Sequence, residues 1–242
     1  MEKNISDKLI LHTDPSSPTS EAVRCLRTNI LFLNKGEYVK VIALTSAFPG
    51  EGKSFLVANL GVATAQSNKK TLLIDCDIRK QGLSNIFGVD KSKGLCDVLL
   101  KKKEELSIDN IPVVDTGIAN LSLIPSGLYA SNPSELLSSP VLEHIILMAR
   151  DNFDIIFLDM PPVLSVADPV IVAQKVDALI FVVAANTTNK KAAKRAYSVL
   201  KGANLNIIGT VLNRADAGAG GYYRYKYKYG GDHGDYYGEN KK

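Results

Sequence analysis

The sequence predicts an α/β fold in which a mostly parallel central sheet is flanked by helices on both faces. Short runs of Val, Ile and Leu without polar alternation are typical of strands buried on both sides. These runs alternate with segments whose apolar residues recur at helical spacing, the order expected of parallel strands joined by crossover helices. A chain of 242 residues with 45% hydrophobic and 22% charged residues can build such a core.

The first eighteen residues are polar and proline-marked, so we expect an extended N-terminal arm there. Ser17-Pro18 has the pattern of a helix start, with Ser as the cap and Pro in the first turn. Four apolar residues follow at helical spacing and are expected to face the core: Val23, Leu26, Ile30 and Leu33. The opposite face carries charges in steps of three: Glu21, Arg24 and Arg27.

Strand-like and helix-like segments then alternate up to Arg214. The predicted strands are Val39–Ser46, Thr71–Cys76, Leu121–Ile124, Asp154–Asp159, Ala178–Ala184 and Ile207–Leu212. The predicted helices after the first are Lys53–Gln66, Pro133–Arg150, Asp168–Lys175 and Lys190–Lys201. We therefore expect a folded domain over 19–214 and a flexible tyrosine-rich tail over 215–242.

The segment Ala47–Ser54 lies between a predicted strand and a predicted helix, and it matches the phosphate-binding loop G-x-x-x-x-G-K-[ST] except at Ala47. Glycines let the backbone N–H groups wrap an anion at a helix N-terminus. Lys53 is expected to reach the β- and γ-phosphates of ATP, and the Ser54 hydroxyl to bind Mg²⁺. The predicted nucleotide-binding residues are Pro49, Gly50, Glu51, Gly52, Lys53, Ser54 and Phe55. Asn213 either contacts adenine or forms a turn.

Three aspartates end apolar strands. Asp75 and Asp77 follow one strand and, two residues apart, can address one site. Asp159 ends another strand, and ligands of open α/β sheets bind at the carboxyl ends of the strands. We expect Ser54, Asp77 and Asp159 to hold the metal, and Lys53, Asp75 and Asp77 to act in catalysis. If the acceptor is a hydroxyl, Asp75 or Asp77 orients it and accepts its proton; we favour Asp75.

Composition excludes several other classes. No apolar run approaches the ~20 residues of a membrane helix, and the N-terminus lacks a hydrophobic signal core, so a cytoplasmic location is expected. The three cysteines and three histidines show no metal or disulfide spacing. A net charge of +4 does not by itself indicate nucleic acid.

Seven of the ten tyrosines lie in the tail: Tyr222, Tyr223, Tyr225, Tyr227, Tyr229, Tyr236 and Tyr237. Aromatic residues interleaved with cations could stack on single-stranded nucleic acid, but few cations are present and there is no second basic patch. The favoured interpretation is a flexible substrate delivered to a neighbouring active site, with no nucleic-acid partner. Residues 215–242 carry five basic and four acidic side chains. Seven phosphates would add about −10 to −14, so phosphorylation is expected to loosen an oligomer.

Together these motifs resemble the bacterial tyrosine kinases of capsule and exopolysaccharide operons, P-loop enzymes related to partitioning ATPases. The resemblance rests on the phosphate-binding loop, the acidic motifs Leu72–Arg79 and Ile155–Pro162, the Glu-x-x-Arg-x-x-Arg helix, Pro125-Ser126-Gly127 with Asn132–Leu137, and the tyrosine tail. Phe55, Gln81 and Met160 depart from the residues usual in that family.

The resemblance implies ATP- and Mg²⁺-dependent autophosphorylation of the tail in trans, within a ring-like oligomer contacted through Glu21, Arg24 and Arg27. It also implies a membrane-spanning adaptor that recruits the kinase to the inner face of the membrane, a cognate tyrosine phosphatase, and protein substrates in polysaccharide synthesis and export. Two alternatives stay open: a partitioning-type ATPase switch with water as acceptor, and a noncatalytic regulator of polysaccharide assembly.

Overall fold

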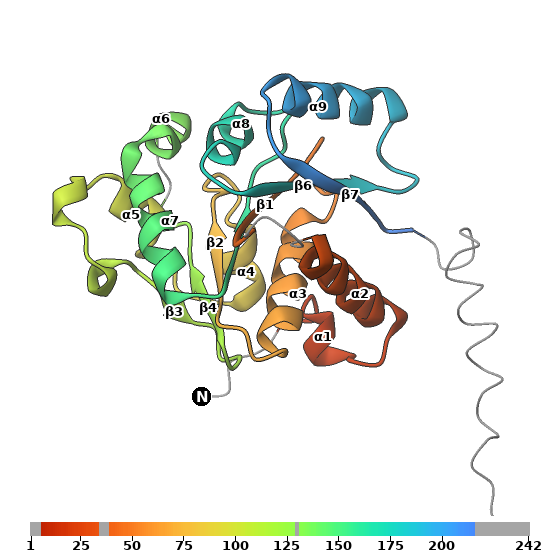
Figure 1. Cartoon of the computed structure of the whole chain (residues 1–242), viewed down its shortest axis with the longest axis horizontal. Coiled ribbons are helices and arrows are strands. Elements are labelled where there is room, and N and C mark those ends of the chain that lie inside the picture. Colours follow the sequence, from red (N-terminus) through yellow and green to blue (C-terminus); the bar gives the residue numbers. More distant parts are fainter. Residues whose placement is uncertain (1–5, 34–38, 129–130, 216–242) are drawn as a thin grey trace, which may run out of the picture.

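The fold is a seven-stranded sheet in the order β3-β4-β2-β5-β1-β6-β7 (Figure 1). A computed structural model describes residues 6–33, 39–128 and 131–215. The strands are β1 (Val41–Ser46), β2 (Thr71–Asp75), β3 (Val114–Asp115), β4 (Leu121–Ile124), β5 (Ile155–Asp159), β6 (Ala178–Ala184) and β7 (Ile207–Asn213). Every pairing is parallel except that of β3 with β4, which confirms the predicted fold class.

Helices cover both faces because the strand residues alternate between two apolar clusters. Val41 and Ala43 face one cluster, while Ile42 and Leu44 face the other. The second cluster packs against α1 (Ile10–Thr13), α2 (Pro18–Leu33), α3 (Lys53–Ala65) and α4 (Gly82–Phe87). The first packs against α5 (Leu95–Leu99), α6 (Pro133–Ser138), α7 (Pro140–Asn152), α8 (Asp168–Ala173) and α9 (Lys190–Gly202). Short 3₁₀ turns cover Lys103–Glu105 and Ile108–Asn110.

The expected extended arm is wrong in its second half. Residues Ile10–Thr13 form the short helix α1, and Leu9 and Leu11 are buried in the core. The Asn59 side chain on α3 fixes this segment by donating to the Lys8 carbonyl (2.8 Å) and accepting from the Leu11 N–H (3.3 Å). The apolar run Leu9–Leu11 is too short to show a helical period, which is why the sequence pattern did not reveal α1.

The single helix predicted over Pro133–Arg150 is also wrong, because it is two helices. Ser139 ends α6 and caps α7, its hydroxyl accepting from the Val141 N–H at 3.1 Å. Pro140 then occupies the first position of α7, where its missing N–H costs nothing. The first-helix prediction is confirmed by α2, with Val23 and Ile30 buried; the Leu33 side chain lies outside the described residues.

Candidate active site

The phosphate-binding loop joins β1 to α3 at the carboxyl edge of the sheet. Gly50 and Gly52 have φ of +83° and +90°, a region that favours glycine. The two differ in their surroundings. A Cβ on Gly50 would meet open space, whereas one on Gly52 would lie 2.0 Å from Nδ2 of Asn213. Glycine at 52 therefore serves close packing as well as backbone conformation.

Glu51 fixes the loop to the neighbouring strands. Its carboxylate accepts from the Phe48 N–H at 3.0 Å and from the Thr188 hydroxyl in the β6–α9 connection. Its carbonyl accepts from the amide of Asn213 at 2.9 Å. Asn213, at the end of β7, therefore binds the phosphate-binding loop itself. This bond is compatible with the predicted contact between Asn213 and the adenine base of a nucleotide. Pro49 is exposed, and Phe55 is half-buried in a hollow between α2, α3 and β7.

Lys53 lies among the predicted carboxylates. Its ammonium nitrogen is 2.8 Å from Oδ2 of Asp77 and 3.7 Å from Oδ1 of Asp159. Burial lowers the pKa of Lys53, but the nearby carboxylates outweigh it and raise the pKa above its ordinary value. The Lys53 side chain is therefore a cation held beside these carboxylates, at the start of α3 next to the phosphate-binding loop.

Asp159 and Ser54 have the character of a metal site. Both oxygens of Asp159 are buried and, among the described residues, accept no hydrogen bond. Burial raises the pKa of Asp159 to about 6, although Lys53 and Ser54 act to lower it. A Cβ on Gly82 would lie 2.4 Å from the Ser54 hydroxyl and 3.3 Å from Asp159, so glycine lets α4 begin beside both groups. Mg²⁺ favours one or two carboxylates with phosphate oxygens, so this donor set fits it.

Asp75 is fully buried next to Asp159 in the register of β2 and β5. One of its oxygens accepts from the N–H (3.2 Å) and hydroxyl (3.1 Å) of Ser84, while the other accepts no hydrogen bond from a described residue. Burial, with the nearby Asp159, raises the pKa of Asp75 to about 8. The three predicted acids thus meet, and Ser84 is a partner that the sequence analysis missed.

A second missed group links the loop after β2 to the outer helices. Arg79 Nε lies 3.0 Å from Oδ2 of Asp168, a fully buried carboxylate at the start of α8. The Ser134 hydroxyl, on α6, donates to the other oxygen of Asp168. In the sequence, Asp168 was only the first residue of a predicted helix, and Ser134 was only one residue of the segment Asn132–Leu137 that resembles the family. Neither pattern indicated a contact with Arg79.

The charged face of α2 is engaged within its own chain. Arg24 pairs with Glu21 at 3.4 Å and donates to the Pro15 carbonyl at 2.8 Å. Arg27 donates to the Ala63 carbonyl of α3 at 3.0 Å. Arg27 therefore holds α2 on α3, and Glu21 is the exposed member of the three.

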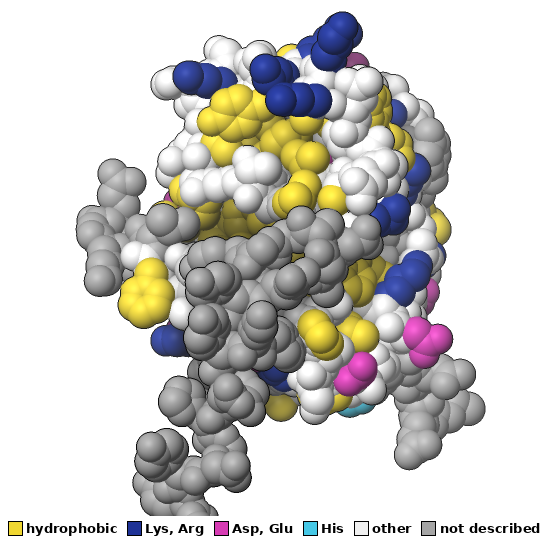
Figure 2. All heavy atoms as spheres, turned by 90° about the vertical axis from the view of Figure 1, so that its right-hand side faces the viewer, with side chains coloured by type: hydrophobic (Ala, Val, Ile, Leu, Met, Phe, Trp, Pro, Cys, Tyr) yellow, Lys and Arg dark blue, Asp and Glu magenta, His cyan; other side chains and the backbone are white. Residues whose placement is uncertain are grey.

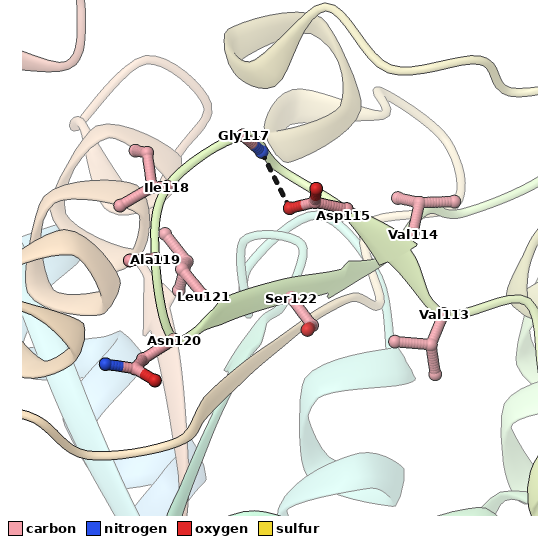
Figure 3. Close-up of a pocket in the computed structure, with 9 residues that line it drawn as sticks. All are labelled: Val113, Val114, Asp115, Gly117, Ile118, Ala119, Asn120, Leu121 and Ser122. Atoms are coloured by element: carbon pink, nitrogen blue, oxygen red, sulfur yellow. Dashed lines mark hydrogen bonds between the residues drawn. The ribbon is translucent and has the colours of Figure 1, made fainter.

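An open hollow lies elsewhere, around the β3–β4 turn (Figure 3). The Asp115 carboxylate accepts from the Gly117 N–H at 2.9 Å and shapes the turn. Leu121, at the start of β4, pairs with Thr71 at the start of β2, so the hollow belongs to the edge of the sheet opposite the phosphate-binding loop. It takes no part in the site.

Comparison with known proteins now identifies this arrangement. The family model described as an AAA domain matches residues 39–202. The tyrosine-protein kinase YwqD of Bacillus subtilis is 37% identical over 213 residues, covering 88% of this chain and 86% of the relative. The chain belongs to the bacterial tyrosine kinases.

Other relatives agree. The putative tyrosine-protein kinase CapB of Staphylococcus aureus is 32% identical over 226 residues, covering 93% of this chain and 97% of CapB. The chain spans only 29% of the putative tyrosine-protein kinase EpsB of Ralstonia solanacearum, at 34% identity over 94% of this chain. Some members of the bacterial tyrosine-kinase family are thus much longer.

Solved structures extend the comparison. The chimerical protein CapA2B2 superposes with a TM-score of 0.80 at 34% identity, covering 86% of this chain and 90% of that one. The kinase domain of the Escherichia coli tyrosine kinase ETK superposes with a TM-score of 0.80 at 28% identity, covering 89% of this chain and 85% of that one. The septum site-determining protein MinD of Pyrococcus horikoshii shares the fold. It superposes with a TM-score of 0.59 at 24% identity, covering 73% of this chain and 72% of that one. No helix in the described part of this bacterial tyrosine kinase is long and apolar enough to cross a membrane.

Proposed function

We propose that this kinase transfers the γ-phosphoryl group of Mg·ATP to its own C-terminal tyrosines, in trans, and to other proteins of capsular or exopolysaccharide synthesis and export. One observation carries the proposal. A buried lysine on a phosphate-binding loop lies within 4 Å of two carboxylates, and the same chain ends in a cluster of seven tyrosines.

ATP fits the loop because the positive φ of Gly50 and Gly52 shapes a backbone that can wrap phosphates, with Lys53 beside them. Ser54, Asp77 and Asp159 would hold magnesium, which when bound neutralises charge on the phosphate oxygens. Lys53 then turns from Asp77 towards the nucleotide. The Glu51–Asn213 bond keeps the loop in place while it does so.

In the transfer, the phenolic oxygen of a tyrosine forms a bond to the γ-phosphorus as the bond to the β,γ-bridging oxygen breaks, and ADP leaves. The phenolic proton passes to a carboxylate late in a loose transition state. Asp75 is our candidate acceptor because one oxygen, occupied by Ser84, fixes its orientation, while the other accepts no hydrogen bond from a described residue. With a pKa of about 8, Asp75 accepts the proton only in its ionised form, whose fraction rises as the pH approaches 8. Asp77 is the second candidate.

Partners follow from the same family. We propose a ring-like homo-oligomer contacted through the α2 face, a membrane-spanning adaptor that recruits and activates the kinase at the inner face of the membrane, and a cognate phosphatase. The tail tyrosines lie outside the described residues.

The fold shared with MinD keeps a second candidate, an ATPase switch with water as the acceptor. One experiment separates the two. The purified chain is incubated with Mg·ATP and a peptide of the adaptor's cytoplasmic tail, and phosphotyrosine and free phosphate are measured together, with Lys53→Met as the control. Phosphotyrosine that forms on the unaltered chain and not on the Lys53→Met variant supports the kinase. ATP hydrolysis without phosphotyrosine supports the switch, and neither activity supports a noncatalytic role.

A further inference from the structure

The segment that contains β6, α9 and β7 carries an unbalanced positive charge, a second basic patch that the sequence analysis did not identify. From residue 178 to 215 there are six basic side chains and no acidic one. Because the whole chain carries +4, the remaining residues together carry −2. Four of the six cations fall within the first six residues of α9: Lys190, Lys191, Lys194 and Arg195.

These four side chains face outward and form no ion pair with another residue that the structure describes. All four residues are exposed, while Ala196 and Leu200 form the buried face of α9. Figure 2 shows Lys and Arg side chains gathered over the top of the molecule, the level at which α9 lies in Figure 1.

The arrangement weakens the helix that carries it. The N-terminus of a helix is the positive end of its dipole, where acidic residues are favourable, yet the first turn of α9 contains none. Lys190 with Lys194, and Lys191 with Arg195, are like charges at i and i+4 spacing, which repel each other on a helix surface. An anionic ligand would turn each of these costs into an attraction.

The tail starts beside this basic end. Since α9 connects two parallel strands, its first turn lies at the carboxyl edge of the sheet. The N–H of Ala185, just before α9, donates to the carbonyl of Asn213 at 2.8 Å, one residue before Arg214. Seven residues lie between Arg214 and Tyr222, and the eight residue steps that join them reach at most about 26–29 Å, which exceeds the ~20 Å length of α9.

We propose that the exposed cations of α9 bind the phosphorylated tail of the same chain. The inference rests on the proposed modification of the tail. Unmodified, residues 215–242 carry +1 and are repelled. Each phosphate adds a charge of about −1.5 to −2. It also adds oxygens that accept hydrogen bonds from Lys and Arg, so the tail is attracted to α9 only after modification. Docking on α9 would withdraw the product tail from neighbouring active sites.

The test uses the full unphosphorylated chain saturated with Mg·ADP, so that the active site is filled. The probe is a synthetic peptide of residues 218–238 with phosphotyrosine at 222, 225 and 227, labelled for fluorescence anisotropy, beside the unmodified peptide. Because the phosphates are built in, the result does not depend on whether the chain phosphorylates itself. In the test variant the four α9 cations become Gln, which keeps helix propensity. The matched control replaces four exposed lysines elsewhere: Lys69, Lys101, Lys102 and Lys103.

We expect the phosphopeptide to bind at least about tenfold more tightly than the unmodified peptide, with an affinity that falls as salt rises. The α9 variant should bind the phosphopeptide about tenfold more weakly than the wild type, and the control variant should bind it with the wild-type affinity. Equal binding of the two peptides, or unchanged binding to the α9 variant, overturns the proposal. Binding to phosphatidylserine vesicles that requires the α9 cations, without phosphopeptide binding, also overturns it and indicates a lipid surface.

Discussion

The ammonium nitrogen of Lys53 lies 2.8 Å from Oδ2 of Asp77, so the lysine of the phosphate-binding loop neutralises a carboxylate of the proposed metal site. The contact is buried and is supplemented by Asp159 at 3.7 Å. In the proposed mechanism the same cation has two successive uses, first as a counter-ion for the carboxylates and then as a ligand of the phosphates.

Replacing Lys53 with Met should consequently affect stability as well as activity. We expect tyrosine phosphorylation to fall at least about 100-fold, because a charge that stabilises the transition state is lost. The free energy of unfolding should fall by about 3–5 kcal/mol at pH 8, since the buried carboxylates lose their counter-ion. The loss should be smaller at pH 5, where Asp159, whose pKa is raised to about 6, can be neutral. Urea unfolding at pH 8 and pH 5 measures this loss in the free energy of unfolding, with Lys69→Met, at an exposed residue, as the control. Equal losses at both pH values would contradict this explanation.

The raised pKa of Asp75 gives a second prediction. The folded chain holds this proton up to a pKa of about 8, whereas the unfolded chain releases it near the ordinary 3.8. Between these values the unfolded state binds fewer protons, so stability contributed by this group is full below pH 4 and is lost as pH rises towards 8. Asp75→Asn cannot ionise, and should gain at least about 1 kcal/mol relative to wild type between pH 5 and pH 8. The exposed Asp151→Asn is the control; a parallel pH profile for both variants would refute the assignment.

Gly50 and Gly52 form a matched pair. Both require a left-handed backbone, but only Gly52 contacts Asn213. We expect Gly52→Ala to weaken ATP binding more than Gly50→Ala, by about tenfold, measured by calorimetry. In an Asn213→Ala background the contact is gone, and the two alanine substitutions should become equivalent. A cost of Gly52→Ala that is independent of residue 213 would show that the contact is unimportant.

These glycines also indicate what the sequence could predict. The loop and the three strand-end acids follow from local patterns whose geometry is fixed by parallel strands, and Asp75 and Asp159 do pair in register. The contacts of Gly82 and Ser84 were not predictable, because α4 has only six residues and no apolar period. Asp168 and Ser134 meet Arg79 from helices far along the chain, a tertiary contact that no local pattern encodes. The Ser139-Pro140 start signal was present, but the apolar period continues through it.

The α2 face gives a fourth prediction. Glu21→Ala should lower the mass of the oligomer in light scattering while leaving the melting temperature near that of wild type, because Glu21 is exposed. Arg27→Ala should lower both, since it removes the bond to the Ala63 carbonyl and about 1–2 kcal/mol of stability. A Glu21→Ala chain with the wild-type mass would argue against an interface at this face.

Transfer between chains is tested by mixing two variants of the 242-residue chain with Mg·ATP and the adaptor peptide. One carries Lys53→Met and an intact tail; the other is active, with its seven tail tyrosines changed to Phe. Mass spectrometry then locates phosphate on residues 222–237 of the Lys53→Met chain. We predict modification of that tail in the mixture and none when the Lys53→Met chain is incubated alone. An unmodified tail in the mixture, while the active chain consumes ATP, would contradict transfer between chains.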